Sequence, residues 1–193
     1  MLLDPVHCVF AAVILLRSLF VGIVFGVLTS DNQVDEVRMK AVRQISEGVK
    51  LTFHRAFDLC INKDEAICSV IKLGCDRLLT SGQEGTAIAG KENLKVLQQK
   101  YGEYIRIIAA AGVKIENARS LIADTGILGV HTGSGVDYDY VETHHYIDPQ
   151  VFGDMMRWKG ANIDLVEAFV NKCMKGWGGG SLPPVDAIGS DGY

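Results

Sequence analysis

Val49-Lys-Leu-Thr-Phe-His-Arg-Ala-Phe-Asp58 is a short apolar, strand-like run that ends in three polar groups. An imidazole and a guanidinium follow the last apolar residue directly, and a carboxylate comes three residues later. In parallel α/β proteins, ligands are met at the carboxyl ends of the strands. The segment therefore predicts a buried strand that leads into a ligand site, with His54, Arg55 and Asp58 as candidate ligand-binding residues.

A second segment of the same kind, Arg77-Leu-Leu-Thr-Ser-Gly-Gln83, ends in two hydroxyls and a glycine. One predicted helix separates the two segments, so we expect neighbouring strands whose ends meet at one edge of a sheet. Thr80, Ser81 and Gly82 are the candidate residues there.

From residue 21 onward, strand-like and helix-like segments alternate. The strand-like segments are continuous apolar runs, which is typical of a parallel sheet covered on both faces. The predicted strands are Val21–Leu28, Val49–His54, Arg77–Thr80, Ile105–Ala109 and Gly126–His131.

The intervening segments carry apolar residues at helical spacing, and each one closes at a glycine. Asn62, with Glu65 three residues later, resembles a capping box. The predicted buried positions are Val34, Val37, Ala41 and Ile45; Ala66, Ile67, Val70 and Ile71; Leu94, Leu97 and Tyr101; and Ile115, Ala118, Leu121 and Ile122.

Five strand–helix units fit in 193 residues, whereas a closed (β/α)8 barrel normally needs about 250. The fold class is therefore α/β, as an open five-stranded sheet or as an incomplete TIM barrel. We expect one domain over residues 1–175, with a final helix at Ile163–Met174 buried through Leu165, Val166, Phe169 and Val170. Residues 138–160 lack a clear period, and the tail 176–193 is expected to be disordered because Gly, Ser, Pro and Asp dominate it.

Composition narrows the function classes. The net charge of −4 gives no electrostatic basis for binding nucleic acid or an anionic membrane. Five cysteines without CxxC spacing indicate neither a disulfide framework nor a zinc site, which favours a cytoplasmic location. The apolar run Cys8–Leu28 is interrupted by Arg17, so we interpret it as a buried helix and strand rather than a membrane span.

The residues resemble the CutC copper-homeostasis family, in family order and spacing from about residue 20 to residue 135. The matching segments are Gly22-Ile-Val-Phe-Gly-Val-Leu-Thr29, Leu51–Asp58, Asp76–Gln83, Ala110-Ala-Gly-Val113 with Asn117, and Gly129-Val-His-Thr132. The resemblance implies a TIM barrel and a cytosolic protein associated with copper. It also implies that this chain begins near the fourth strand of the barrel and lacks some of the family's polar site residues and proposed copper-ligating cysteines.

Residue chemistry leaves several roles open. His54 suits a metal ligand, an acid–base group or a donor to an anion, and equally a buried histidine satisfied by backbone. Arg55 suits carboxylate or phosphate binding, and equally an ion pair with Asp58. Together with Thr80–Gly82, Gly112 and the glycine-flanked His131 predict an anion site at the strand ends.

Copper receives less support from the residues themselves. Soft Cu(I) prefers thiolate, thioether and imidazole ligands, which makes His54, His131 and Cys60 the candidates. Cys68 suits helix packing better, and His144-His145 resembles an exposed loop pair. The copper assignment therefore depends on the resemblance.

Three functional hypotheses follow. The first is a CutC-type copper homeostasis protein that binds copper or a small anionic ligand. The second is a TIM-barrel enzyme that acts on a small phosphorylated or carboxylated metabolite. The third is a truncated isoform, or an incomplete gene product, that is inactive alone or needs another chain, with a homo-oligomer as one form.

Overall fold

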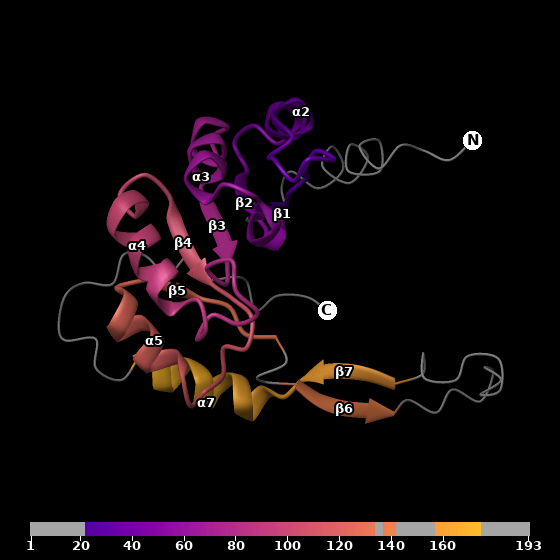
Figure 1. Ribbon diagram of the computed structural model, residues 1–193. Helices are drawn as coiled ribbons and strands as arrows, with labels where there is room; N and C mark the ends of the chain where they lie inside the picture. Colours follow the sequence, from indigo (N-terminus) through magenta and orange to yellow (C-terminus); the bar gives the residue numbers. More distant parts are fainter. Residues whose placement is uncertain (1–21, 134–136, 142–156, 175–193) are drawn as a thin grey trace, which may run out of the picture.

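The computed structural model describes residues 22–133, 137–141 and 157–174. Five parallel strands form one sheet in chain order, so each strand pairs with the next along the sequence (Figure 1). The strands are β1 (Gly22–Phe25), β2 (Lys50–Phe53), β3 (Arg77–Thr80), β4 (Arg106–Ala109) and β5 (Gly129–Val130). All five lie inside the predicted segments and most are shorter.

Helices follow the strands and line one side of the sheet (Figure 1). They are α2 (Glu36–Ile45), the 3-10 helix η1 (Arg55–Leu59), α3 (Lys63–Lys72), α4 (Lys91–Tyr101), α5 (Ala118–Thr125) and α7 (Ile163–Met174). Helix α4 packs against α5, and α5 packs against α7. This parallel β/α arrangement confirms the predicted α/β class and is consistent with part of a TIM barrel.

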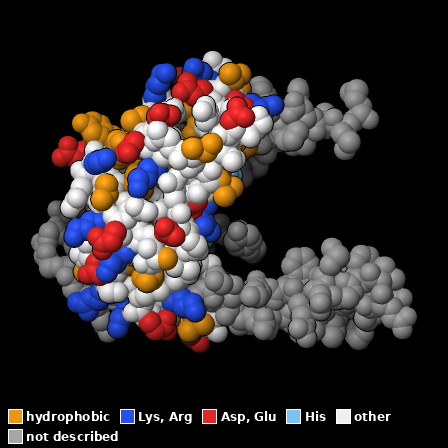
Figure 2. Space-filling model, viewed as in Figure 1, with side chains coloured by type: hydrophobic (Ala, Val, Ile, Leu, Met, Phe, Trp, Pro, Cys, Tyr) orange, Lys and Arg blue, Asp and Glu red, His pale blue; other side chains and the backbone are white. Residues whose placement is uncertain are grey.

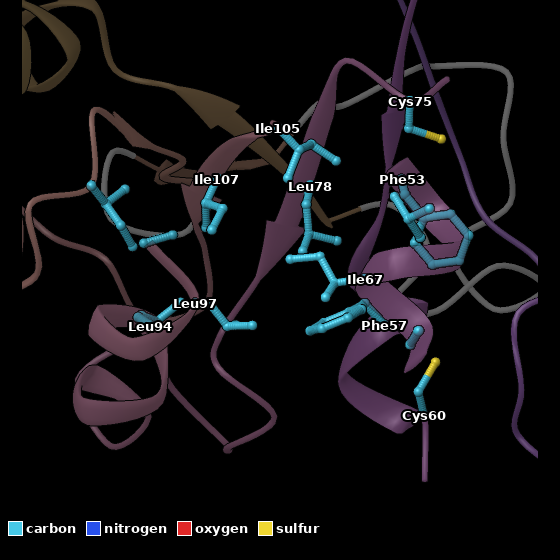
Figure 3. Close-up of a cluster of buried hydrophobic side chains, with 14 of the residues drawn as sticks. Phe53, Phe57, Cys60, Ile67, Cys75, Leu78, Leu94, Leu97, Ile105 and Ile107 are labelled. Atoms are coloured by element: carbon cyan, nitrogen blue, oxygen red, sulfur yellow. The ribbon is translucent and has the colours of Figure 1, made fainter. Parts of the chain in front are cut away.

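The core lies between the sheet and these helices. The strand residues that face the helices are fully buried, including Phe53 on β2, Leu78 on β3 and Ile107 on β4. Ile67 and Leu97 meet them from α3 and α4 (Figure 3). Burial of each such side chain contributes about 1.5–3 kcal/mol. Burial of these apolar side chains therefore holds the helices against the sheet.

The residues predicted to begin or end α3 and α5 do so. The Asn62 side-chain oxygen accepts hydrogen bonds from the N–H groups of Asp64 and Glu65, at 3.1 and 3.3 Å. Gly74 and Gly126 close these helices with φ of 72° and 73°, a left-handed conformation that favours glycine.

Two predicted helix faces are buried only in part. On α2, Val37 is 80% exposed, whereas Met39 and Val42 are buried. Asp35 caps this helix, and Val34 precedes it and pairs with Leu28.

On α7, Phe169 is the one buried residue of the predicted stripe, because Leu165, Val166 and Val170 are between 37% and 51% exposed. Apolar spacing identified both helices, but the tertiary contacts determined which face is buried.

Two strands were not predicted. β6 (Asp137–Val141) and β7 (Arg157–Ala161) pair antiparallel, in a region without a clear sequence period. The expected N-terminal helix, the pair His144-His145 and the tail 176–193 lie outside the described residues. Within the part of the chain that the structure describes, no helix has the length and apolar character needed to cross a membrane.

Candidate functional site

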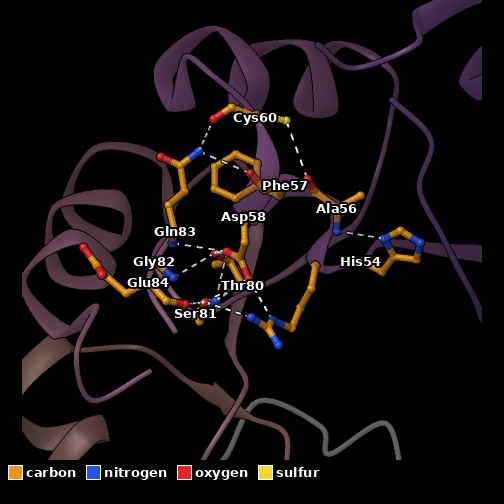
Figure 4. Close-up of polar contacts among 11 residues, drawn as sticks. His54, Ala56, Phe57, Asp58, Cys60, Thr80, Ser81, Gly82, Gln83 and Glu84 are labelled. Atoms are coloured by element: carbon orange, nitrogen blue, oxygen red, sulfur yellow. Dashed lines mark hydrogen bonds and ion pairs between the residues drawn. The ribbon is translucent and has the colours of Figure 1, made fainter. Parts of the chain in front are cut away.

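The carboxylate of Asp58 is the centre of a polar network at the carboxyl ends of β2 and β3 (Figure 4). Its side chain is 7% exposed, and five donors converge on it. The Ser81 N–H lies 3.1 Å from both carboxylate oxygens, and the Ser81 hydroxyl lies 2.9 Å from one of them. The Gln83 N–H at 3.2 Å and the Thr80 hydroxyl complete the set from β3 and its loop. Asp58 therefore fastens η1 to the segment after β3.

The loop after β3 is held by further contacts that sequence reasoning missed. The Gln83 side-chain amide donates to the carbonyls of Phe57 and Cys60, at 3.2 and 2.8 Å. Asn93, on α4, donates to the Gly82 carbonyl at 2.9 Å. Gln83 has a φ of 62°, an uncommon value for a residue with a side chain. In the sequence, the position of Gln83 directly after Gly82 was the one sign of a turn. The sequence did not show that Gln83 itself adopts the left-handed conformation.

Arg55 lies on the solvent side of this network. Its Nε donates to Asp58 at 2.8 Å, and one terminal nitrogen donates to the Ser81 hydroxyl at 3.3 Å. The ion pair with Asp58 that the sequence suggested is thus present. The Arg55 side chain is 44% exposed, so part of the guanidinium still faces solvent. Because Asp58 balances its charge, Arg55 would bind an anion through directed N–H groups rather than through net charge.

His54 points away from the Asp58 network, as Figure 4 shows. Its Nδ1 accepts a hydrogen bond from the Ala56 N–H at 3.0 Å. Since Nδ1 is the acceptor, neutral His54 carries its proton on Nε2. The ring packs on β1's end, where a Cβ added to Gly26 would lie 2.8 Å from Nδ1. In this conformation, His54 offers a hydrogen-bond donor rather than a free nitrogen lone pair.

The remaining candidates lie along the same edge of the sheet. The loop at Gly112 contacts the loop after β3, because Ala87 N–H donates to the Ala111 carbonyl at 2.9 Å. Asn117 holds this loop by donating to the Gly112 carbonyl at 2.9 Å. His131 follows β5 and is exposed. His131 is three inter-strand steps from His54, roughly 14 Å along the sheet at the usual strand spacing.

The proposed copper ligands are not brought together. Cys60 is 7% exposed, and burial and then the nearby charge of Asp58 raise the pKa of its thiol. A protonated thiol is a poor metal ligand compared with a thiolate. Within residues 22–133, 137–141 and 157–174, no group of three or more His, Cys, Asp or Glu side chains is arranged to hold a metal ion. A copper site built on His54, His131 and Cys60 would therefore need a change in conformation.

A pocket of about 430 Å³ lies at the opposite ends of the strands, where Cys75, Asp76, Ile105 and Arg106 line it. Asp76 is already engaged there by the Leu51 N–H and Lys50. In parallel β/α folds this end serves stability, so we place the candidate site at the carboxyl ends.

The model of the CutC family matches residues 13–136, which is more than half of the chain. The chain belongs to the CutC family. The match spans β1 to β5 and includes all the predicted ligand-binding and metal-ligating residues. The resemblance identified from the sequence motifs is thereby confirmed.

Individual CutC proteins agree. The CutC protein of Bacteroides fragilis is 41% identical over 123 residues, covering 61% of this chain and 49% of that protein. This CutC-family chain thus spans about half the length of the curated relatives it matches.

Among solved structures, the CutC protein of Streptococcus agalactiae, which is named for copper homeostasis, is similar with a TM-score of 0.59 and 28% identity. The similarity covers 65% of this chain and 60% of that one. A structure described as "Native KDPGal structure" matches with a TM-score of 0.51 and 16% identity, over 88% of this chain and 66% of the other. At that identity, the similarity shows the fold alone.

Proposed function

We propose that this chain serves copper homeostasis in the cytoplasm, and that its strand-end site binds a small anionic ligand. Family membership supports the biological role. The observation that carries the ligand class is Arg55, whose guanidinium donates hydrogen bonds to Asp58 and Ser81 while the side chain as a whole stays 44% exposed. A fixed fork of N–H donors fits the oxygens of a carboxylate or phosphate.

His54, which lies near Arg55 in the sequence, is also a hydrogen-bond donor. The Nε2 of His54 is a hydrogen-bond donor in the neutral ring, and the Arg55 guanidinium also carries only donors. These features favour a phosphorylated or carboxylated metabolite over a bare cation. They also fit an enzyme in which His54 transfers a proton to or from the ligand. The identity of the ligand would determine which of its groups reacts.

Arg55→Gln is expected to weaken the binding of inorganic phosphate or of a small phosphorylated metabolite by about tenfold to hundredfold. A hydrogen bond to a charged group contributes about 1.5–3 kcal/mol, which corresponds to that range. Isothermal titration calorimetry on the 193-residue chain measures the change. The control Arg119→Gln removes an exposed arginine on α5 that is not part of the Asp58 network. Equal affinities for the parent chain and Arg55→Gln would contradict the proposed ligand class.

Direct copper coordination is the second candidate, and the family's association with copper supports it. It predicts that Cys60→Ser and His54→Ala weaken Cu(I) binding at least about tenfold, because Cu(I) prefers thiolate and imidazole. It also predicts tighter binding as the pH rises, since the proton must leave a thiol whose pKa is raised.

Competition with a Cu(I) chelator, followed at several pH values, tests both effects. Cys68→Ser, which replaces the exposed thiol on α3, is the matched control. His131→Ala tests whether the third candidate ligand joins the site. Cu(I) affinity that is independent of pH and of Cys60 would exclude this candidate.

A further inference from the structure

The Arg55 guanidinium has one edge in use and one edge left for a ligand. A guanidinium carries five N–H groups in a plane, one on Nε and two on each terminal nitrogen. The Nε group donates to Asp58, and Nη2 donates to the Ser81 hydroxyl, so both bonds lie along the same edge. Among the described residues, no acceptor is bonded to Nη1. The remaining edge, between Nη1 and Nη2, therefore presents two parallel N–H groups.

Asp58 holds this edge in one orientation. The carboxylate that accepts from Arg55 also accepts from the N–H and the hydroxyl of Ser81 and from the N–H of Gln83. Both of its oxygens are bonded and its side chain is 7% exposed, so it has little freedom to move with Arg55. A ligand that matches the free edge would therefore cost the protein little ordering entropy on binding.

The charges around this edge give no excess of positive charge. Helix η1 contributes Arg55 and Asp58, and the loop at residues 81–90 contributes Glu84, whose carboxylate is exposed. One positive and two negative charges leave these two segments with a net charge of −1. In Figure 4, Glu84 lies beside Ser81, whose hydroxyl donates to the Glu84 backbone carbonyl. A second negative charge on a ligand would therefore find no cation of its own in these segments.

Other cations near the ends of the strands are engaged or offset. The Lys63 ammonium, on α3, donates to the side-chain oxygen of Asn93 at 3.0 Å. Lys114, in the loop after β4, is exposed and is followed two residues later by Glu116. On the face of the molecule seen in Figure 2, Lys and Arg side chains are interspersed with Asp and Glu side chains. Mixed charges of this kind create no strong positive field for a multiply charged anion.

We propose that the group recognised by this site is a carboxylate, held on the Nη1–Nη2 edge of Arg55, rather than a phosphate. The proposal rests on the anion-binding function proposed above and names its ligand class. A carboxylate is planar and singly charged, so its two oxygens match two parallel N–H groups. A phosphate monoester carries a charge of about −1.5 to −2 at pH 7, which one guanidinium already paired with Asp58 does not neutralise. The ligand is therefore a small carboxylated metabolite.

NMR titration of the ¹⁵N-labelled 193-residue chain with acetate and with methyl phosphate compares the two anionic groups on the same methyl group. The Arg55 Nε–H signal reports on the site, because this group belongs to the guanidinium that binds the anion. At about pH 7.5 the phosphate monoester is mostly dianionic, whereas acetate is singly charged. We expect acetate to bind at least about fivefold more tightly, which is the size of one contact between like charges in water.

Arg55→Lys separates the shape of the edge from its charge. Lysine keeps the positive charge and can still pair with Asp58, but it has no pair of parallel N–H groups. The substitution is expected to weaken acetate binding about tenfold, followed at the Ser81 N–H signal. Arg119→Lys makes the same change at an exposed arginine on α5 and should bind acetate like the parent chain. Glu84→Gln removes a negative charge from the loop and should tighten methyl phosphate binding more than acetate binding.

The outcomes distinguish the carboxylate proposal from the anion-binding function. If methyl phosphate binds as tightly as acetate, and Arg55→Gln weakens both, the carboxylate proposal is overturned and the anion site stands. If Arg55→Lys binds acetate like the parent chain, charge rather than the edge is recognised, and the proposal is again overturned. If neither probe shifts any signal of the site at concentrations up to about 50 mM, both the proposal and the anion-binding function are overturned.

Discussion

Asp58→Ala is expected to lower the free energy of unfolding by about 3–5 kcal/mol, the range for removing one partner from a buried charged network. The substitution leaves the N–H groups of Ser81 and Gln83 without their acceptor and leaves Arg55 without its ion-pair partner. Each buried donor left unsatisfied costs about 1–3 kcal/mol. The loop after β3 would lose its main link to η1.

The size of the loss in unfolding free energy distinguishes two roles of Asp58, namely pairing with Arg55 and anchoring the loop after β3. If its main contribution were the ion pair with the partly exposed Arg55, its loss would cost at most about 1 kcal/mol. Arg55→Gln removes that pair but leaves the loop N–H groups bonded to Asp58, so this variant should stay close to the parent stability. Urea unfolding, followed by circular dichroism, gives both values. Asp58→Ala within about 1 kcal/mol of the parent would show that the network does not anchor the loop.

Asp124→Asn is the matched control for this experiment. Asp124 forms an exposed ion pair with Lys91 and accepts no backbone N–H among the bonds that the structure describes. Its substitution should therefore change stability much less than Asp58→Ala.

Gly90→Ala is expected to destabilise the fold by about 3 kcal/mol, at the upper end of the usual effect of overpacking. A Cβ at this position would overlap the Ser81 carbonyl oxygen, which is backbone and cannot rotate away. Gly82 also lies close to Gly90, because a Cβ on Gly82 would lie 2.6 Å from the Gly90 carbonyl oxygen. Relief would require moving the segment that Asp58 holds.

Gly85→Ala is the matched control in the same loop. A Cβ there meets no atom within 4 Å, so the change should be within about 0.5 kcal/mol of the parent. Thermal and urea unfolding of the two variants give the comparison. If Gly90→Ala were as stable as Gly85→Ala, the close backbone contact between the ends of this loop would not exist in solution. Phosphate binding by Gly90→Ala should also weaken, because Ser81 supports Arg55.

Some features of this protein follow from the sequence alone, because the forces behind them act over a few residues. Asn62 caps α3 and Gly126 ends α5 through bonds and torsions that involve their immediate neighbours. The continuous apolar runs predict parallel strands, and the regular alternation with helices predicts their order. Because all these strands run the same way, the polar groups at their ends were expected along one edge of the sheet. The motifs that carry the family resemblance lie in the same segments.

Only the tertiary structure decided how those polar groups are used. Asp58 binds the loop 23 residues later, and this contact depends on the pairing of β2 with β3. The direction of His54 depends on the space beside Gly26, which directly follows the neighbouring strand β1. The exposure of Val37 depends on which face of α2 meets the sheet. In each case the contacting residue is distant in the sequence, so local periodicity and propensity cannot predict the contact. Strand register and side-chain packing determine it.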